Sequence, residues 1–123
     1  MSAELEYFTD DELRCRCGCF TYFFDEESRK KLNLIRHEAG FPFVVTSACR
    51  CADHPLERNK SSTGAHTYGK AVDIAVRGEK ALVLLEIAIR HGVKRIGVNQ
   101  KGTARFIHLD WCDELPSPAC WSY

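Results

Sequence analysis

Residues 64–76 read Gly-Ala-His-Thr-Tyr-Gly-Lys-Ala-Val-Asp-Ile-Ala-Val, and this stretch decides how we expect the chain to fold. From residue 71 onward, large apolar residues alternate with small or charged ones, which predicts a β-strand with one core-facing side. That side carries Val72, Ile74 and Val76, so Asp73 points the other way, between two alanines. His66 stands seven residues before Asp73, in a loop whose glycines allow it to fold back over the strand.

A second stretch, residues 104–111, shows the same alternation. Ile107, Leu109 and Trp111 share one face, while Phe106, His108 and Asp110 share the other. Two strands therefore each turn an ionisable group away from the core. Together, His66, Asp73 and His108 make a set of three zinc-type ligands, and the fourth position stays open for water or substrate, as in catalytic rather than structural zinc sites.

The rest of the chain predicts one domain over residues 1–123, with a cysteine-rich N-terminal segment, 1–24. Helices and strands are mixed without regular alternation, which favours an α+β fold with a mostly antiparallel sheet and flanking helices. The tail is expected to be irregular, with Trp121 and Tyr123 packed down. The other predicted elements are helices at 25–40 and 79–91, strands at 43–47 and 95–98, a turn at 99–102 and a long polar loop at 48–65.

Composition narrows the function further. Lys and Arg together number 17, and Asp and Glu together also number 17, so the chain lacks the excess of basic residues that is typical of nucleic-acid binding. No apolar run approaches the about 20 residues that span a bilayer. The first residues lack the apolar region of a secretory signal. We therefore expect a monomer without nucleic-acid or membrane partners, made in the cytoplasm.

The quoted stretch also resembles a known motif. Residues 64–73 are similar to the S-x-H-x-x-G-x-A-x-D motif of the zinc D-Ala-D-Ala carboxypeptidase family, and residues 106–110 to its F-x-H-x-D strand. Residues 46–50 resemble its S-G-Y-R strand end. The CRCGC run at 15–19, Arg95-Ile-Gly97 and the terminal Trp-x-Tyr look like the phage and prophage branch. The family includes D-alanyl-D-alanine dipeptidases and the L-alanyl-D-glutamate endopeptidases of phage endolysins, and its fold is shared with the hedgehog signalling domain.

The resemblance implies a zinc metallopeptidase that cleaves peptidoglycan stem peptides at bonds involving D-amino acids, after release to the bacterial cell wall. His66, Asp73 and His108 would hold one zinc ion per chain. Arg50 would bind a substrate carbonyl or carboxylate and stabilise oxyanion charge. Tyr68 and His54 are further candidates for substrate binding, and His54 also for proton transfer.

The chain departs from the family pattern in places. Gly64 replaces the motif serine, and Ala48-Cys49 replaces Gly-Tyr. Family members carry an acidic general base three residues before the last histidine ligand, where this chain has Arg105. Asp110 then either accepts the proton or orients a ligand. The missing acid also motivates an alternative, a non-catalytic zinc-containing wall-binding or phage structural module.

The seven cysteines leave several interpretations open. The thiols could be reduced and mostly buried, one or two disulfides could form, or a second, structural metal site could exist. The C-x-C-x-C run is tighter than the usual C-x2-C zinc hairpin. Cys49 and Cys51 flank Arg50, so either could tie the N-terminal segment to the substrate loop, for instance through a Cys17–Cys51 bridge.

Overall fold

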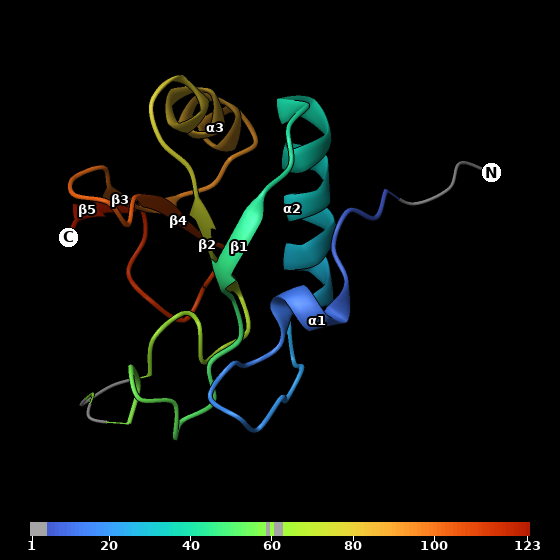
Figure 1. Ribbon diagram of the computed structural model, residues 1–123, viewed down its shortest axis with the longest axis vertical. Helices are drawn as coiled ribbons and strands as arrows, with labels where there is room; N and C mark the ends of the chain where they lie inside the picture. The colour runs from blue at the N-terminus through green and yellow to red at the C-terminus, as the bar shows by residue number, and fades with distance from the viewer. Residues whose placement is uncertain (1–4, 59, 61–62) are drawn as a thin grey trace.

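The computed structural model describes residues 5–58, 60 and 63–123. Figure 1 shows α3 lying over the sheet and α2 beside β1. The helices and strands expected between residues 25 and 111 are all present, with bounds that agree to within two residues. In chain order the elements are α1 (Asp10–Leu13), α2 (Glu26–Ala39), β1 (Val44–Ser47), β2 (Ala71–Ala75), α3 (Glu79–Arg90), β3 (Arg95–Asn99), β4 (Phe106–Asp110) and β5 (Ala119–Ser122).

The strands form one five-stranded sheet in the order β1-β2-β4-β3-β5. Its first three pairings are antiparallel, and the last, between β3 and β5, is parallel. The sheet is therefore mixed, which corrects the expectation of a mostly antiparallel sheet. In the centre, Asp73 of β2 stands directly opposite His108 of β4.

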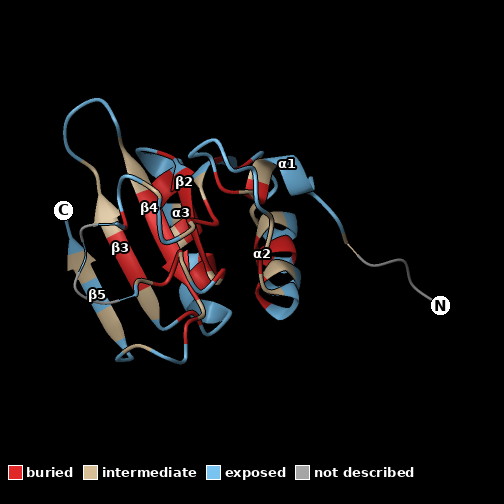
Figure 2. Cartoon of the chain, turned by 90° about the horizontal axis from the view of Figure 1, so that it is seen from below, coloured by how far each residue is buried: buried red, intermediate tan, exposed pale blue. Residues whose placement is uncertain are grey.

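The correction comes from β5, which lies in the tail that we expected to be irregular. This strand runs along the outer edge of β3, and its residues alternate between half-buried and exposed. An edge strand of this kind has no continuous apolar face, so the sequence carries little periodic signal for it. Figure 2 shows that the central strands are largely buried, whereas β5 at the rim of the sheet is half-buried or exposed.

Local signals explain where α2 begins and ends. The carboxylate of Asp25 accepts a hydrogen bond of 2.9 Å from the backbone N–H of Ser28 and so caps the start of α2. Gly40, in the left-handed conformation, ends this helix. The apolar sides of α2 and α3 join the core-facing residues of the sheet in one buried cluster, which includes Leu32, Ile35, Leu84, Ile87, Val72, Ile74, Ile107 and Leu109.

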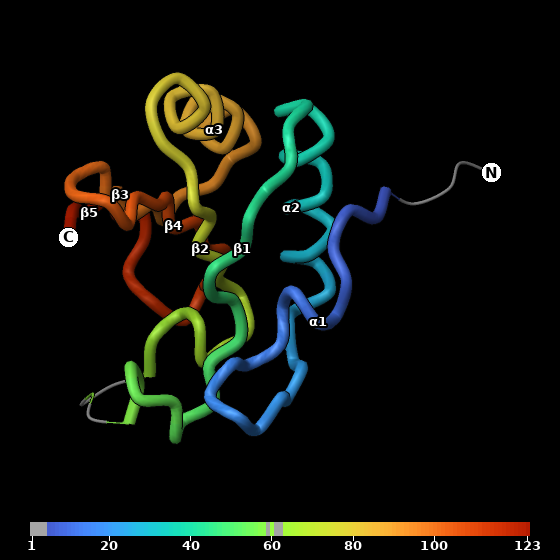
Figure 3. Tube along the Cα trace, in the orientation of Figure 1, coloured from blue at the N-terminus to red at the C-terminus, as the bar shows by residue number. Residues whose placement is uncertain are grey.

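The N-terminal segment packs beside the loops at one end of the sheet (Figure 3). The backbone N–H of Cys49 donates to the carbonyl of Leu13 at 3.1 Å, and that of Asp25 donates to Gly69 at 2.7 Å. A Cβ atom on Gly69 would lie 2.4 Å from the carbonyl oxygen of Phe23. Glycine is therefore required at this motif position by the close packing of the N-terminal segment.

Among the described residues, no helix is long and apolar enough to cross a membrane. The side of the sheet that faces away from the core cluster carries Asp73, His108 and Asp110, yet all three side chains are buried. The loop between β1 and β2 and the C-terminal tail contribute residues to the cavity over this face. The loop and the tail therefore shield the three side chains from solvent and form the walls of the candidate site.

Candidate metal centre

Three side chains that are far apart in the sequence meet on the non-core face of the sheet. Asp73 and His108 come from neighbouring strands and face each other in register. The Asp73 Oδ1 atom lies 2.9 Å from His108 Nδ1 and 3.3 Å from His66 Nε2. All three residues are buried, and their ligand atoms lie within 4.8 Å of one another. The structure thus brings together the three residues that the sequence singled out as metal ligands.

His66 reaches this point because the chain just after β1 holds its loop in place. The backbone N–H of Arg50 donates to the carbonyl of His66 at 3.1 Å. His66 Nδ1 lies 2.7 Å from the carbonyl oxygen of Ala48. Because a carbonyl can only accept, Nδ1 carries the proton, and the lone pair of Nε2 faces Asp73.

His108 is oriented in the same manner by a carboxylate. Both ring nitrogens of His108 face a carboxylate: Nε2 lies 2.7 Å from Asp110 Oδ2, and Nδ1 lies 2.9 Å from Asp73 Oδ1. When Nε2 keeps its proton and donates to Asp110, the lone pair of Nδ1 faces the position beside Asp73. Two imidazole lone pairs and a carboxylate oxygen therefore converge, and a cation between them removes their mutual repulsion. This donor set fits a zinc ion.

The charges at the site favour a positive group at this position. Burial opposes ionisation of Asp73, but contacts with His108 and His66 outweigh it and hold the pKa of the carboxyl below its usual range. Burial lowers the pKa of His108, but the carboxylates of Asp110 and Asp73 raise it by more. For His66, burial dominates and lowers the pKa, which favours the neutral, ligating form.

Asp110 is wholly buried, and both of its oxygens are occupied. Oδ2 contacts His108, while Oδ1 accepts hydrogen bonds from Arg95 Nε at 2.8 Å and from the backbone N–H of Cys112 at 3.2 Å. The guanidinium of Arg95 in turn lies 5.1 Å from the ring centre of Trp121. Asp110 is thus fixed from two sides and holds the ring of His108 in place.

Arg50 lies beside the candidate ligands, and its guanidinium makes three contacts. Nη2 donates to Asp73 Oδ2 at 3.2 Å, Nη1 to Glu57 Oε2 at 3.1 Å, and Nε to Ser47 Oγ at 2.9 Å. These contacts use three of the five N–H donors of an arginine. Arg50 also lines the cavity over the site. Its planar fork therefore links a candidate metal ligand to the loop that covers it.

Glu57 is a site residue that sequence reasoning missed. It is buried, and it accepts hydrogen bonds from Arg50, from Lys60 at 3.0 Å and from the Thr67 hydroxyl at 3.1 Å. Burial alone would raise the pKa of Glu57, but the hydrogen bonds from Lys60 and Arg50 outweigh it and lower the pKa. A glutamate in a polar loop gives no periodic signal, so only the folded loop reveals its role.

A cavity of about 470 Å³ opens over the three candidate ligands. Trp121 and Tyr123 from the tail line it, and the Trp121 ring centre lies 5.1 Å from that of His108. The residues lining it are Arg50, Leu56, Lys60, Gly64, Ala65, His66, Asp73, Arg95, Phe106, His108, Asp110, Leu115, Trp121 and Tyr123.

Three residues singled out from the sequence lie away from this cavity. Tyr68 is exposed, and His54 is half-buried with its Nδ1 accepting from the backbone N–H of Leu56 at 3.1 Å. Burial, followed by the charge of Arg50, lowers the pKa of His54. Arg105, at the position of the expected base, donates to the carbonyl of Gly102 at 2.9 Å. None of the three is among the described residues that line the cavity.

Two oriented imidazoles and a carboxylate beside an open cavity define a candidate metal centre of the catalytic kind. A model of the family described as Peptidase M15 matches residues 6–110, and the chain therefore belongs to the peptidase M15 family. This match confirms the family that the sequence motifs indicated. The match ends at the last residue of β4, so β5, Trp121 and Tyr123 lie beyond it. A search of curated proteins found no match.

Proposed function

We propose that the protein is a zinc metallopeptidase that hydrolyses bonds involving D-amino acids in peptidoglycan stem peptides, as a D-Ala-D-Ala carboxypeptidase or an endolysin-type endopeptidase. One observation carries the proposal: three buried donor atoms converge within 4.8 Å beneath an open cavity. Membership of the peptidase M15 family supports a peptide substrate. The choice of D-amino-acid bonds, and of the bacterial cell wall as the place of action, rests on the motif resemblance.

In this proposal His66 Nε2, Asp73 Oδ1 and His108 Nδ1 hold the zinc ion. When bound, zinc would polarise the scissile carbonyl and lower the pKa of a water molecule. Ala48 and Asp110 keep the two imidazoles in the ligating tautomer through 2.7 Å contacts. These contacts fix the ligands before metal arrives, which reduces the cost of ordering the site.

Arg50 is proposed to bind the substrate. Its contacts to Asp73, Glu57 and Ser47 hold the guanidinium at the cavity wall and leave two N–H donors for a carbonyl or carboxylate oxygen. A planar, rigid donor group suits the charge that develops on an amide oxygen during hydrolysis. His54 and Tyr68 would contact only parts of a long substrate that extend beyond the cavity.

Asp110 is proposed to be a positioning residue. The sequence left its role open between general base and ligand orientation. Both of its oxygens accept hydrogen bonds, and one of the donors is His108 itself. These hydrogen bonds favour a role in orienting the His108 ring over a role as general base, because a general base needs an oxygen that is free to receive the proton.

In the described part of the chain, the lack of a carboxylate free to act as general base favours a second candidate function. Among the described residues, Asp73 and Asp110 are the only carboxylates that line the cavity, so neither a glutamate nor a free aspartate stands ready as a base. A zinc-containing module that binds wall peptides without cleaving them, or a phage structural module, would keep the ligands and the cavity and dispense with the base.

Digestion of purified muropeptides separates the two functions. The zinc-loaded wild type should release peptide products that mass spectrometry identifies, and the bond that is cut defines the specificity. His108→Ala serves as the inactive control. If the wild type binds sacculi but leaves every muropeptide intact, the peptidase proposal fails and the binding module stands.

A further inference from the structure

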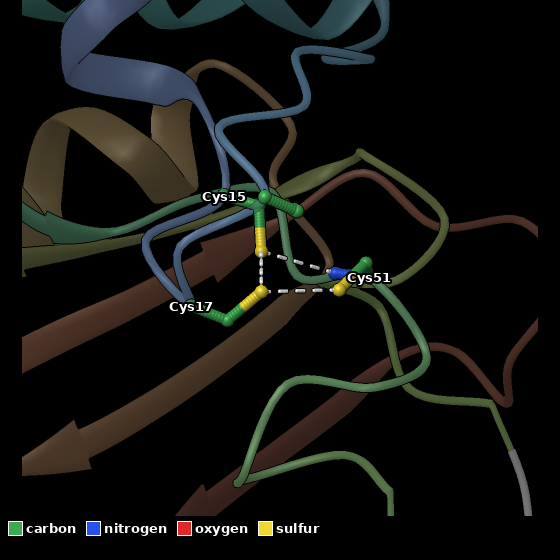
Figure 4. Close-up of side chains that lie close together, drawn as sticks. Cys15, Cys17 and Cys51 are labelled. Carbon is green, nitrogen blue, oxygen red and sulfur yellow. Dashed lines mark hydrogen bonds between the residues drawn. The ribbon is translucent and has the colours of Figure 1, made fainter.

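Four cysteines gather at the end of the sheet, outside the cavity described above. Cys15, Cys17 and Cys19 come from the N-terminal segment, and Cys51 directly follows Arg50. The Sγ atoms of Cys15 and Cys17 lie 3.6 Å apart, and those of Cys17 and Cys51 lie 3.4 Å apart. All four sulfur atoms lie within 4.8 Å of one another. Figure 4 shows the sulfurs of Cys15, Cys17 and Cys51 pointing toward one another from two separate loops.

These separations suit a shared metal ion. A Zn–S bond of about 2.3 Å places two sulfurs of a tetrahedral site about 3.8 Å apart. The separations of 3.4 and 3.6 Å are close to that edge and well beyond the about 2.0 Å of a disulfide. Packing does not explain the group either, because Cys17 and Cys19 are exposed, whereas free cysteine normally behaves as a buried apolar residue.

The backbone around the cluster is shaped toward the sulfurs. The N–H of Cys51 points to Cys15 Sγ at 3.3 Å, and that of Thr21 points to Cys19 Sγ at 3.5 Å. Donors aimed at sulfur favour the thiolate, which is the form that binds metal. Two residues with positive φ, Gly18 at 112° and the exposed Phe20 at 55°, curl the loop back on itself. A bulky residue rarely adopts this conformation without a compensating contact.

We propose that Cys15, Cys17, Cys19 and Cys51 form a second metal site, a structural tetrathiolate centre for zinc. Four protein ligands would fill the tetrahedron, so the site would have no open position for substrate. Three ligands at alternate positions of one tight loop replace the usual C-x2-C hairpin, and Gly18 makes that loop possible.

The proposed metal would hold two segments of the chain together. Cys51 neighbours Arg50, so the metal would tie the N-terminal segment to the chain that carries the substrate-binding arginine. The backbone bond from Cys49 to Leu13, 3.1 Å long, lies on the other side of Arg50 and links the same two segments. The proposal does not depend on peptidase activity, because a structural metal would stabilise the fold in either proposed function.

Metal counting on the full-length protein tests the proposal. Elemental analysis should find about two zinc ions per wild-type chain, one in each site. The double variant Cys17→Ser/Cys51→Ser should retain one, and His108→Ala should also retain one. Cys120→Ser, which changes an exposed cysteine outside the cluster, should keep two. A wild type with a single zinc that is lost in His108→Ala and kept in the double cysteine variant would overturn the proposal.

A spectroscopic measurement on the wild type guards against variants that fail to fold. Cobalt replacing zinc in a tetrathiolate site should give intense sulfur-to-metal charge-transfer absorption in the near ultraviolet, which a site of two histidines and an aspartate cannot produce. The band should persist in His108→Ala. Absence of the band in cobalt-loaded wild type, or a native mass that shows a Cys17–Cys51 disulfide after purification without reductant, would refute the tetrathiolate centre.

Discussion

The histidine–aspartate centre and the cysteine cluster are two groups of metal-ligand side chains built on different supports. Asp73 and His108 stand opposite each other on neighbouring strands, so the sheet register sets their separation. Three of the four cysteines stand on one curled turn, and Cys51 stands on a second loop that packs against it. The first group lies under an open cavity and offers three ligands, and the second offers four. Rigid strands suit a metal centre that must keep one coordination position open for water or substrate. A structural centre with four protein ligands has no open position, and its metal can itself order the loops that carry the ligands.

The strongest test of this contrast is His108→Ala. Removing one of three ligands should abolish tight metal binding at the sheet centre and all hydrolysis, because the remaining two donors cannot hold the ion. The cysteine cluster should keep its metal, since it shares no ligand with the sheet centre. Elemental analysis together with muropeptide digestion measures both effects. Retention of the full metal content would contradict the ligand assignment.

Arg50 belongs to both regions, since it contacts Asp73 and is followed by Cys51. In Arg50→Lys a point charge replaces the planar fork, and turnover should fall by about 10²–10³-fold, as when an oxyanion donor is lost. Zinc content should hold, because none of the ligand atoms is removed. Steady-state kinetics on a muropeptide measures the effect, and unchanged turnover would show that Arg50 only braces Asp73 and Glu57.

Asp110→Asn sharpens the account of the sheet centre. The amide is neutral and has one acceptor oxygen where the carboxylate has two, so His108 should be oriented less firmly and metal affinity should fall by about 10–100-fold. Competition with a chromogenic chelator measures this affinity. A different result, a loss of turnover of about 10²–10⁴-fold with metal affinity unchanged, would make Asp110 the general base.

The smallest effect is expected at Tyr123, which lines the cavity and packs on Phe106 with ring centres 4.9 Å apart. Burial raises the pKa of Tyr123, so its hydroxyl stays protonated and can donate to a bound substrate. Tyr123→Phe keeps the ring and removes this donor, which should cost about 3–10-fold in kcat/KM, the equivalent of one hydrogen bond. Metal content at both centres should not change, and a loss of metal would show that the tail supports the ligands.

Much of the fold could be predicted from local patterns. Alternation placed β2 and β4 and showed which of their side chains leave the core, and the acidic start and glycine end of α2 marked its bounds. β5 was missed because an edge strand lacks an apolar face, and its parallel pairing with β3 makes the sheet mixed. The family assignment followed from the motifs and is confirmed. That the three candidate ligands hold a metal stays a prediction.

The sequence by itself determined that Asp73 and His108 point away from the core, because the pleat of a strand sends successive side chains to opposite faces wherever the strand lies. Only the tertiary structure decided that Glu57 braces Arg50, that Trp121 packs near His108, and that Cys51 meets the CRCGC loop. These contacts join residues that lie far apart in the sequence, on loops and on the edge strand β5. The positions of loops and of an edge strand depend on how the whole chain packs, and no local periodicity encodes them.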